Sequence, residues 1–186
     1  METVAQLLEE LRRYRPADAL EAEHHRAVLD LLSDGRSPFW RGQFVPGHIT
    51  ASCFVVDPCW QRVLLHHHRR LNRWLQMGGH VESGESAIDA ALREAAEESG
   101  LRDLALLTDG IVDVDVHDIP AGKGEPDHSH FDVRYVARTS HPDSIVIDRA
   151  ESNELEWVEL DRAIPLMNEE ASKRVIMKIR KILVRK

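Results

Sequence analysis

Apolar positions recur every three or four residues in the first third of the chain. They form two stripes, one from Val4 to Leu11 and one from Leu20 to Leu32. This period predicts two amphipathic helices, and we expect residues 1–40 to form a helical extension ahead of the main domain. Such a pair is typical of a packing element, although a lid or a dimer surface would show the same pattern.

From residue 49 the period changes to short, β-branched segments. Segments 49–57 and 62–68 predict a hairpin with its turn near Pro58. A third strand is expected through Trp74 and Leu75 into the double glycine at 78–79.

The strongest helical pattern covers residues 86–99, and Gly100 follows it in the position that a helix C-cap prefers. Later apolar segments predict strands near 104–107, 111–117, 131–138 and 154–159, and then a C-terminal helix over 162–184. This order of elements predicts a mixed α/β domain over residues 41–186 behind the helical extension.

Composition and charge narrow the classes of partner and the location expected for this protein. The chain has 186 residues, with 24 Lys and Arg against 32 Asp and Glu, so its formal charge is −8, which argues against a nucleic-acid polymer as partner. No uncharged apolar run has the length of a membrane-spanning helix, so no membrane partner is expected. The N-terminus shows no secretory signal and the only cysteines are Cys53 and Cys59, which favours a cytoplasmic protein.

Three acids dominate the helix expected over 86–99. Glu94, Glu97 and Glu98 fall at positions i, i+3 and i+4, so their side chains converge on one face. A solvated acidic face has the same spacing. Carboxylates fixed on a packed helix are also what a hard divalent cation requires, because Mg²⁺ prefers oxygen ligands and commonly bridges protein acids to phosphates.

The surrounding sequence, GHVESGESAIDAALREAAEESGL at residues 79–101, resembles the Nudix box at every position. The resemblance implies a Nudix fold, an α/β/α sandwich around a mixed β-sheet. It also implies hydrolysis of a pyrophosphate bond in a nucleoside triphosphate, or in a nucleoside diphosphate linked to another moiety, with Mg²⁺ or Mn²⁺ as cofactor. By resemblance, the metal ligands and catalytic residues come from Gly79, Glu94, Glu97 and Glu98, and the scaffold residues are Glu85, Arg93 and Gly100.

The general base is a separate question. In the family it is either a box glutamate or an acid in the loop before the last strand, where this chain has Glu151 and Glu154. Glu154 is our first choice, and an ordinary exposed acid is the alternative. Removal of a general base usually lowers turnover by about 10²-fold or more, so a substitution can decide.

Polar residues alternate with valine over residues 111–117 and alternate again over 128–132. If these strands pair across the loop 118–127, six side chains share one sheet face: Asp113, Asp115, His117, His128, His130 and Asp132. Such a face would suit a second metal, substrate phosphates or an acid–base pair. A hairpin that exposes this face to solvent would show the same alternation in sequence. Our hypothesis is that His117, His130 and Asp132 line the substrate pocket, with His80 and Arg69 as further candidates.

The family resemblance leaves the substrate open. No tyrosine lies between Tyr14 and Tyr135, and Met77 precedes the double glycine where many nucleotide-sanitising members have proline. The related isopentenyl-diphosphate isomerases have a catalytic cysteine where this chain has Gly78, so an isomerase is not expected. The alternative to an enzyme is a Nudix domain that only senses a nucleotide or nucleotide sugar. The helical extension and the C-terminal helix also make a homodimer plausible.

Overall fold

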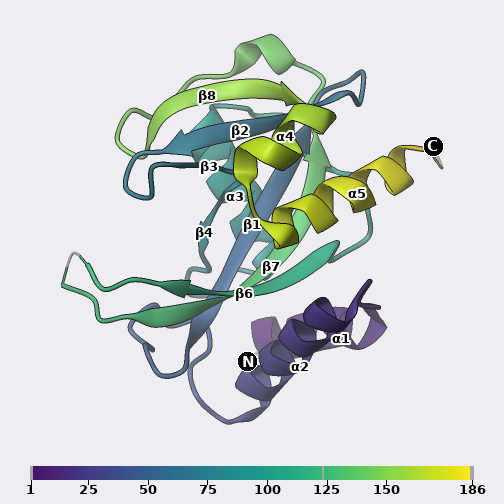
Figure 1. Cartoon of the computed structure of the whole chain (residues 1–186). Helices are drawn as coiled ribbons and strands as arrows, with labels where there is room; N and C mark the ends of the chain where they lie inside the picture. Colours follow the sequence, from purple (N-terminus) through teal and green to yellow (C-terminus); the bar gives the residue numbers. More distant parts are fainter. Residues whose placement is uncertain (1, 123, 185–186) are drawn as a thin grey trace.

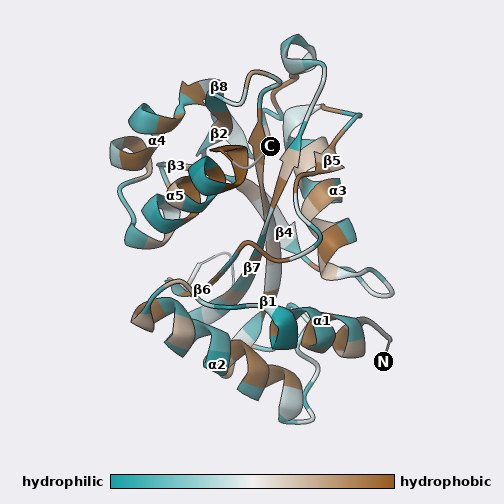
Figure 2. Ribbon diagram, turned by 90° about the vertical axis from the view of Figure 1, so that its right-hand side faces the viewer, coloured by the Kyte–Doolittle hydropathy of each residue, from teal (hydrophilic) through white to brown (hydrophobic). Residues whose placement is uncertain are grey.

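The computed structural model of the chain describes residues 2–122 and 124–184. One mixed β-sheet lies between two layers of helices, with α4 and α5 on one side and α3 on the other, while α1 and α2 lie across one end (Figures 1 and 2). This α/β architecture with N-terminal helices is the one expected from the sequence. The helices are α1 (Glu2–Arg13), α2 (Ala19–Ser33), α3 (Ala87–Ser99), α4 (Leu160–Met167) and α5 (Glu170–Val184), with a short 3₁₀ turn at Pro142–Ser144.

The sheet is organised around the long strand β1. Its strands are β1 (Gly47–Val56), β2 (Arg62–His68), β3 (Arg73–Leu75), β4 (Met77–His80), β5 (Ala105–Leu106), β6 (Asp113–Ile119), β7 (His128–Arg138) and β8 (Ser152–Glu159). Strand β1 runs parallel to β7 and antiparallel to β2 and β4. Strands β5 and β6 pair with β7, and β3 and β8 pair with β2.

Alternation along β1 divides the interior into two layers. Its odd-numbered residues, such as Ile49 and Cys53, pack in one cluster with α1, α2 and α3. Phe54 and Val56 face the opposite way and pack in a second cluster under α4 and α5. Every residue of β1 is buried, so β1 is the central strand of the sandwich.

Side-chain and backbone caps fix both ends of α3. The Ser86 hydroxyl accepts a hydrogen bond from the Asp89 amide at 3.2 Å, which satisfies one free N–H of the first turn. At the other end, Gly100 has φ +75° and donates its N–H to Ala96 O at 2.8 Å. A Cβ at Gly100 would also lie 2.8 Å from Cβ of Val146, so glycine is required here for both conformation and space.

Two expected elements are each divided in the structure. The segment predicted as one strand through Trp74 to Gly79 forms β3 and β4, because the chain changes its hydrogen-bonding partner from β2 to β1 at Gln76. The predicted helix over 162–184 forms α4 and α5, since Asn168 adopts the left-handed conformation with φ +52° and ends α4.

Among the described residues, no helix is long and apolar enough to cross a bilayer.

The N-terminal helices cover the free edge of β6. Glu21 accepts a hydrogen bond from the Val114 amide, and Nδ1 of His24 accepts one from the Val116 amide, both at 3.2 Å. Side chains of α2 thus satisfy backbone donors that a ninth strand would otherwise pair. An edge strand covered in this way is protected from pairing with another chain.

Candidate active site

The acidic face of α3 lies against the backbone of β4. Oε2 of Glu98 accepts a hydrogen bond from the Gly78 amide at 3.2 Å. A Cβ built on Gly79 would lie 2.5 Å from Oε1 of Glu94, so a side chain at this position would displace the Glu94 carboxylate. The double glycine and two of the three glutamates therefore form one compact cradle.

Arg93 connects the loop before α3 to the helix itself. Its guanidinium makes a two-point ion pair with Glu85, through Nε at 2.9 Å and Nη2 at 3.0 Å, and also donates to His80 O at 3.0 Å. Nη1 donates to Glu94 at 2.9 Å and to Glu97 at 3.2 Å. Arg93 thus orients two of the acids while it holds the loop, the scaffold position that the family resemblance implied.

Electrostatics at this cradle disfavour negative charge. Burial, followed by the charges of Glu94, Glu151 and Asp148, raises the pKa of Glu98 to about 8. Burial also raises the pKa of Glu94, in spite of its hydrogen bond from Arg93. A cation would stabilise both ionised carboxylates, and oxygen donors beside a glycine backbone are the chemistry that Mg²⁺ or Mn²⁺ takes. The residues present therefore fit a hard divalent cation.

The two acids considered as general base lie in different surroundings. Glu151 is one of the groups whose charge raises the pKa of Glu98, so the loop before β8 faces the acidic cluster. Glu154 lies on β8 opposite His67 and lines an open depression of about 380 Å³ that also includes Arg149. This placement favours Glu151 as the general base, whereas the sequence analysis favoured Glu154.

The polar stripe shares one face, as its alternation suggested, but most of it is buried. Strands β6 and β7 pair in register, with His117 opposite His130 and Asp115 opposite Asp132. The three aspartates of the stripe are each no more than 5% exposed, so the solvent-facing hairpin does not describe them. All three lie within 3.6 Å of the buried guanidinium of Arg134, and Asp113 also pairs with Arg174 and Lys178.

Asp132 uses both carboxylate oxygens inside the protein. Oδ1 accepts from the Thr50 hydroxyl at 3.1 Å, and Oδ2 accepts from the Ser52 hydroxyl and from Nε of Arg134, both at 2.8 Å. These bonds assign Asp132 a structural role in place of the substrate contact that the sequence suggested. Arg134 was missed, and the only signal for it was its place among alternating polar residues on the same strand.

The histidines gather at the other end of this face. His80 and His130 have ring centroids 5.5 Å apart, and His117 lies 5.7 Å from His130. The ring of His48 on β1 has its centroid 4.8 Å from that of His130 and 5.0 Å from that of His80. Arg69 is placed elsewhere, exposed beside the loop before β8, where its Nη1 donates to Arg149 O at 3.0 Å.

Comparison with known proteins adds a family to this geometry. A family model described as the NUDIX domain matches residues 46–179. A probable DHNTP pyrophosphohydrolase of Lactococcus lactis subsp. cremoris is 35% identical over 112 residues, or 59% of this chain. The match spans 64% of that relative's length.

Solved structures show the same fold. The C. elegans Ap4A hydrolase binary complex superposes with a TM-score of 0.61 at 21% identity, over 74% of this chain and 98% of that chain. A NUDIX-family hydrolase from Clostridium perfringens gives a TM-score of 0.55 at 26% identity, over 75% and 98%. The E. coli dihydroneopterin triphosphate pyrophosphohydrolase gives 0.56 at 18% identity, over 72% and 95%.

Proposed function

The chain belongs to the NUDIX family, and we propose that it hydrolyses a pyrophosphate bond in a nucleoside triphosphate or in a nucleoside diphosphate linked to another group. One observation carries this proposal: α3 and β4 bring Glu94 and Glu98 together against the Gly78–Gly79 backbone, where a Cβ on Gly79 would overlap the Glu94 carboxylate. A buried acidic cradle with this close a backbone approach suits a cation-assisted reaction at phosphorus.

The proposed metal ligands are the Gly79 carbonyl and the carboxylates of Glu94, Glu97 and Glu98. When bound, Mg²⁺ or Mn²⁺ neutralises phosphate oxygens and lowers the pKa of water. Arg93 holds Glu94 and Glu97 in place through its two contacts, and Glu85 fixes Arg93 in turn. Mutual support of this kind keeps the acids oriented before substrate arrives, which is where enzymes gain most of their electrostatic stabilisation.

We propose that Glu151 accepts the proton of the attacking water. Its charge acts on Glu98 of the acidic cluster, and its side chain is exposed on the turn before β8. In a pair of single variants, Glu151→Gln should lower turnover by about 10²-fold and Glu154→Gln by less than about threefold. The reverse order would restore Glu154 as the base.

Substrate contacts are proposed from the histidines near the box, namely His80, His117 and His130. Imidazole nitrogens can hydrogen-bond to a base or to phosphate oxygens. The name of the Lactococcus lactis relative makes dihydroneopterin triphosphate the first compound to test. Dinucleoside polyphosphates follow, since the C. elegans protein acts on Ap4A by its name.

The deciding experiment measures phosphate and pyrophosphate release in Mg²⁺ or Mn²⁺ from dihydroneopterin triphosphate, nucleoside triphosphates, Ap4A, ADP-ribose, nucleotide sugars and CoA. The Glu97→Gln/Glu98→Gln variant should lose at least about 10²-fold in turnover on whichever compound reacts. Glu82→Gln is the matched control, because Glu82 is an exposed acid in the loop before α3. Thermal stabilisation by a compound that is never turned over would favour a nucleotide-sensing domain instead.

A further inference from the structure

Sheet register places histidines from distant parts of the sequence in one cluster. His48 of β1 lies opposite His130 of the parallel strand β7. His128 precedes His130 by two residues, so it faces the same side of the sheet. The cluster is therefore fixed by three positions on the two central strands and not by a mobile loop.

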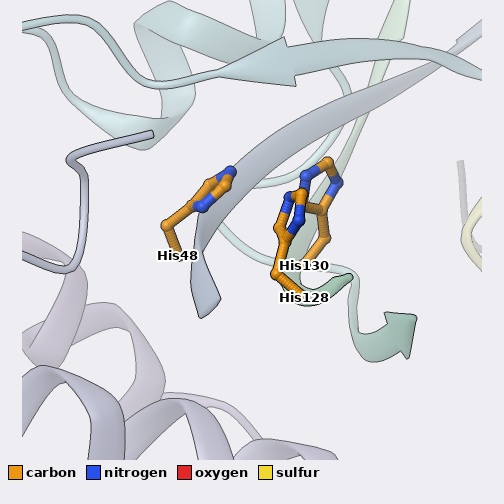
Figure 3. Close-up of side chains that lie close together, drawn as sticks. All are labelled: His48, His128 and His130. Carbon is orange, nitrogen blue, oxygen red and sulfur yellow. The ribbon is translucent and has the colours of Figure 1, made fainter. Parts of the chain in front are cut away.

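The three rings are close enough to share one ligand (Figure 3). Ring centroids are 5.1 Å apart for His48 and His128, 4.8 Å for His48 and His130, and 5.2 Å for His128 and His130. One nitrogen of each ring lies within 4.8 Å of a nitrogen of both others. His48 is 1% exposed and His128 is 7% exposed, so the cluster is largely shielded from water.

Hydrogen bonds set which ring nitrogens remain free. Nδ1 of His48 lies 3.2 Å from Gln43 O, and Nδ1 of His128 lies 2.8 Å from Pro126 O. A carbonyl only accepts, so each Nδ1 carries the proton and each Nε2 keeps its lone pair. Within the part of the chain that the structure describes, the buried Nε2 of His48 has no hydrogen-bond partner. A buried acceptor without a partner is costly, and this one points to an absent ligand.

We propose that His48, His128 and His130 bind a first-row transition-metal cation, Zn²⁺ above all, at a site separate from the carboxylate cradle. Imidazole nitrogens suit Zn²⁺, Cu²⁺ or Ni²⁺, whereas Mg²⁺ takes oxygen ligands. Histidines that donate Nδ1–H to a backbone carbonyl are the usual form of metal-binding histidines, because the carbonyl fixes the ring and its tautomer. Three such ligands leave a fourth position open, as in catalytic zinc sites.

The dimensions of the cluster allow this coordination. Tetrahedral Zn–N bonds of about 2.0–2.1 Å require the nitrogens to approach one another by at most roughly 1.5 Å. His80, 5.0 Å from His48 between ring centroids, is the nearest candidate for a fourth ligand from the protein. A surface hollow of about 480 Å³, lined in part by His128, Phe44 and Pro46, gives the cation a route in.

The buried histidines of the cluster are harder to protonate than exposed histidines. Burial, reinforced by neighbouring histidines, lowers the pKa of His130 to about 2 and that of His80 to about 4. Burial likewise lowers the pKa of His48.

The test measures Zn²⁺ binding to the histidine cluster in a protein whose carboxylate cradle has been altered. The metal-free Glu97→Gln/Glu98→Gln protein is titrated with Zn²⁺ by calorimetry, and with Co²⁺ by visible absorption, which reports tetrahedral nitrogen coordination. We expect one tight site per chain, and a loss of about 100-fold or more in Zn²⁺ affinity when His48→Asn and His128→Asn are added. His141→Asn is the control, because this exposed histidine lies beyond the opposite end of β7.

Two results would overturn the proposal. One is a folded His48→Asn/His128→Asn protein, judged by circular dichroism, that binds Zn²⁺ as tightly as its parent. The other comes from the unaltered chain, which covers the case of a variant that does not fold: ¹⁵N spectra of its eleven histidines should show Zn²⁺ shifting the rings of His48, His128 and His130, and Mg²⁺ leaving them in place. Unshifted rings at saturating Zn²⁺ would exclude the site.

Discussion

Arg134 contacts all three buried aspartates on the polar face of the sheet, and its removal gives the sharpest test of how that face is held together. The Arg134 side chain is 2% exposed. Its guanidinium lies 2.8 Å from Asp115, 2.8 Å from Asp132 and 3.6 Å from Asp113. The Arg134→Met variant keeps most of the buried volume and removes only the charge and its hydrogen bonds.

The expected loss of unfolding free energy follows from the partners that each aspartate keeps when Arg134 is removed. Asp113 keeps the ion pair with Arg174 at 2.7 Å, whereas Asp132 keeps only two hydroxyl donors. Removing one partner of a buried ion pair costs about 3–5 kcal/mol, because the other charge stays buried without compensation. For a chain of this length, each kcal/mol lowers the melting temperature by about 2–4 °C, so we expect a fall of roughly 6–20 °C.

The assay is urea unfolding followed by circular dichroism at several pH values, with Arg138→Met as control. Arg138 is an exposed arginine on the same strand, and its removal should change the unfolding free energy by less than about 0.5 kcal/mol. The deficit of Arg134→Met should also shrink as the pH falls from 7 towards 4. Burial alone would raise the pKa of Asp115, but the Arg134 charge, followed by His117, outweighs it and holds that pKa well below its usual range. Without Arg134 the carboxyl takes up a proton in the folded state and loses its unpaired charge.

The refuting results are specific. A loss below about 1 kcal/mol at pH 7 would show that the aspartates are compensated by Arg174, Lys178 and water, and not by Arg134. A large loss that stays constant from pH 7 to pH 4 would show that Met leaves a packing defect, so the cost would not come from an unpaired charge. In either case the argument that this face is an electrostatic core would fail.

Three further substitutions test other parts of the structure. Leu11→Ala should lower the free energy of unfolding, measured in urea, by about 2–5 kcal/mol, because Leu11 is fully buried. Leu20→Ala, at a half-exposed position, should change it by less than about 0.5 kcal/mol. Equal effects of the two substitutions would mean that α1 does not share the core. Burial lowers the pKa of His66 to about 4, below the unfolded value of about 6.5, so stability is full above pH 6.5 and about 3 kcal/mol is lost by pH 4. Thermal unfolding of His66→Asn across this range should show a correspondingly flatter pH dependence, and an unchanged slope would contradict the assignment. Gly79→Ala should lower turnover by about 10²-fold, whereas Gly110→Ala, where a Cβ has room, should not; equal activity would remove the close backbone approach from the mechanism.

The sequence predicted the parts of this protein that depend on local periodicity and on short-range spacing. The helix over 86–99 was expected at almost its observed bounds, because its apolar stripe, Ser86 and Gly100 all lie within one segment. Alternation raised the pairing of β6 with β7 as a condition for a shared polar face, and the structure has that pairing. The family resemblance, carried by residues 79–101, is confirmed by the match over 46–179.

Long-range partners escaped the sequence for a physical reason. Periodicity shows which side of a strand a residue occupies but not which strand lies beside it. The break at Gln76 depends on β3 pairing with β2 and β4 pairing with β1. Asp132 looked like a substrate ligand until Arg134 and two hydroxyls from β1 were seen to occupy its oxygens.

The boundary between residues 40 and 41 is clear in the sequence, but it does not divide the folded protein into independent units. Glu21 of α2 accepts from the β6 backbone and pairs with Lys178 of α5, and Lys178 also lies 2.7 Å from Asp113 of β6. Leu7 and Leu11 pack in the same cluster as the buried residues of α3. The extension therefore joins the sheet edge, the C-terminal helix and the layer that carries the acidic residues. Because α3 rests on this shared layer, loosening α1 and α2 should weaken the support of the acidic cradle without any contact to its carboxylates.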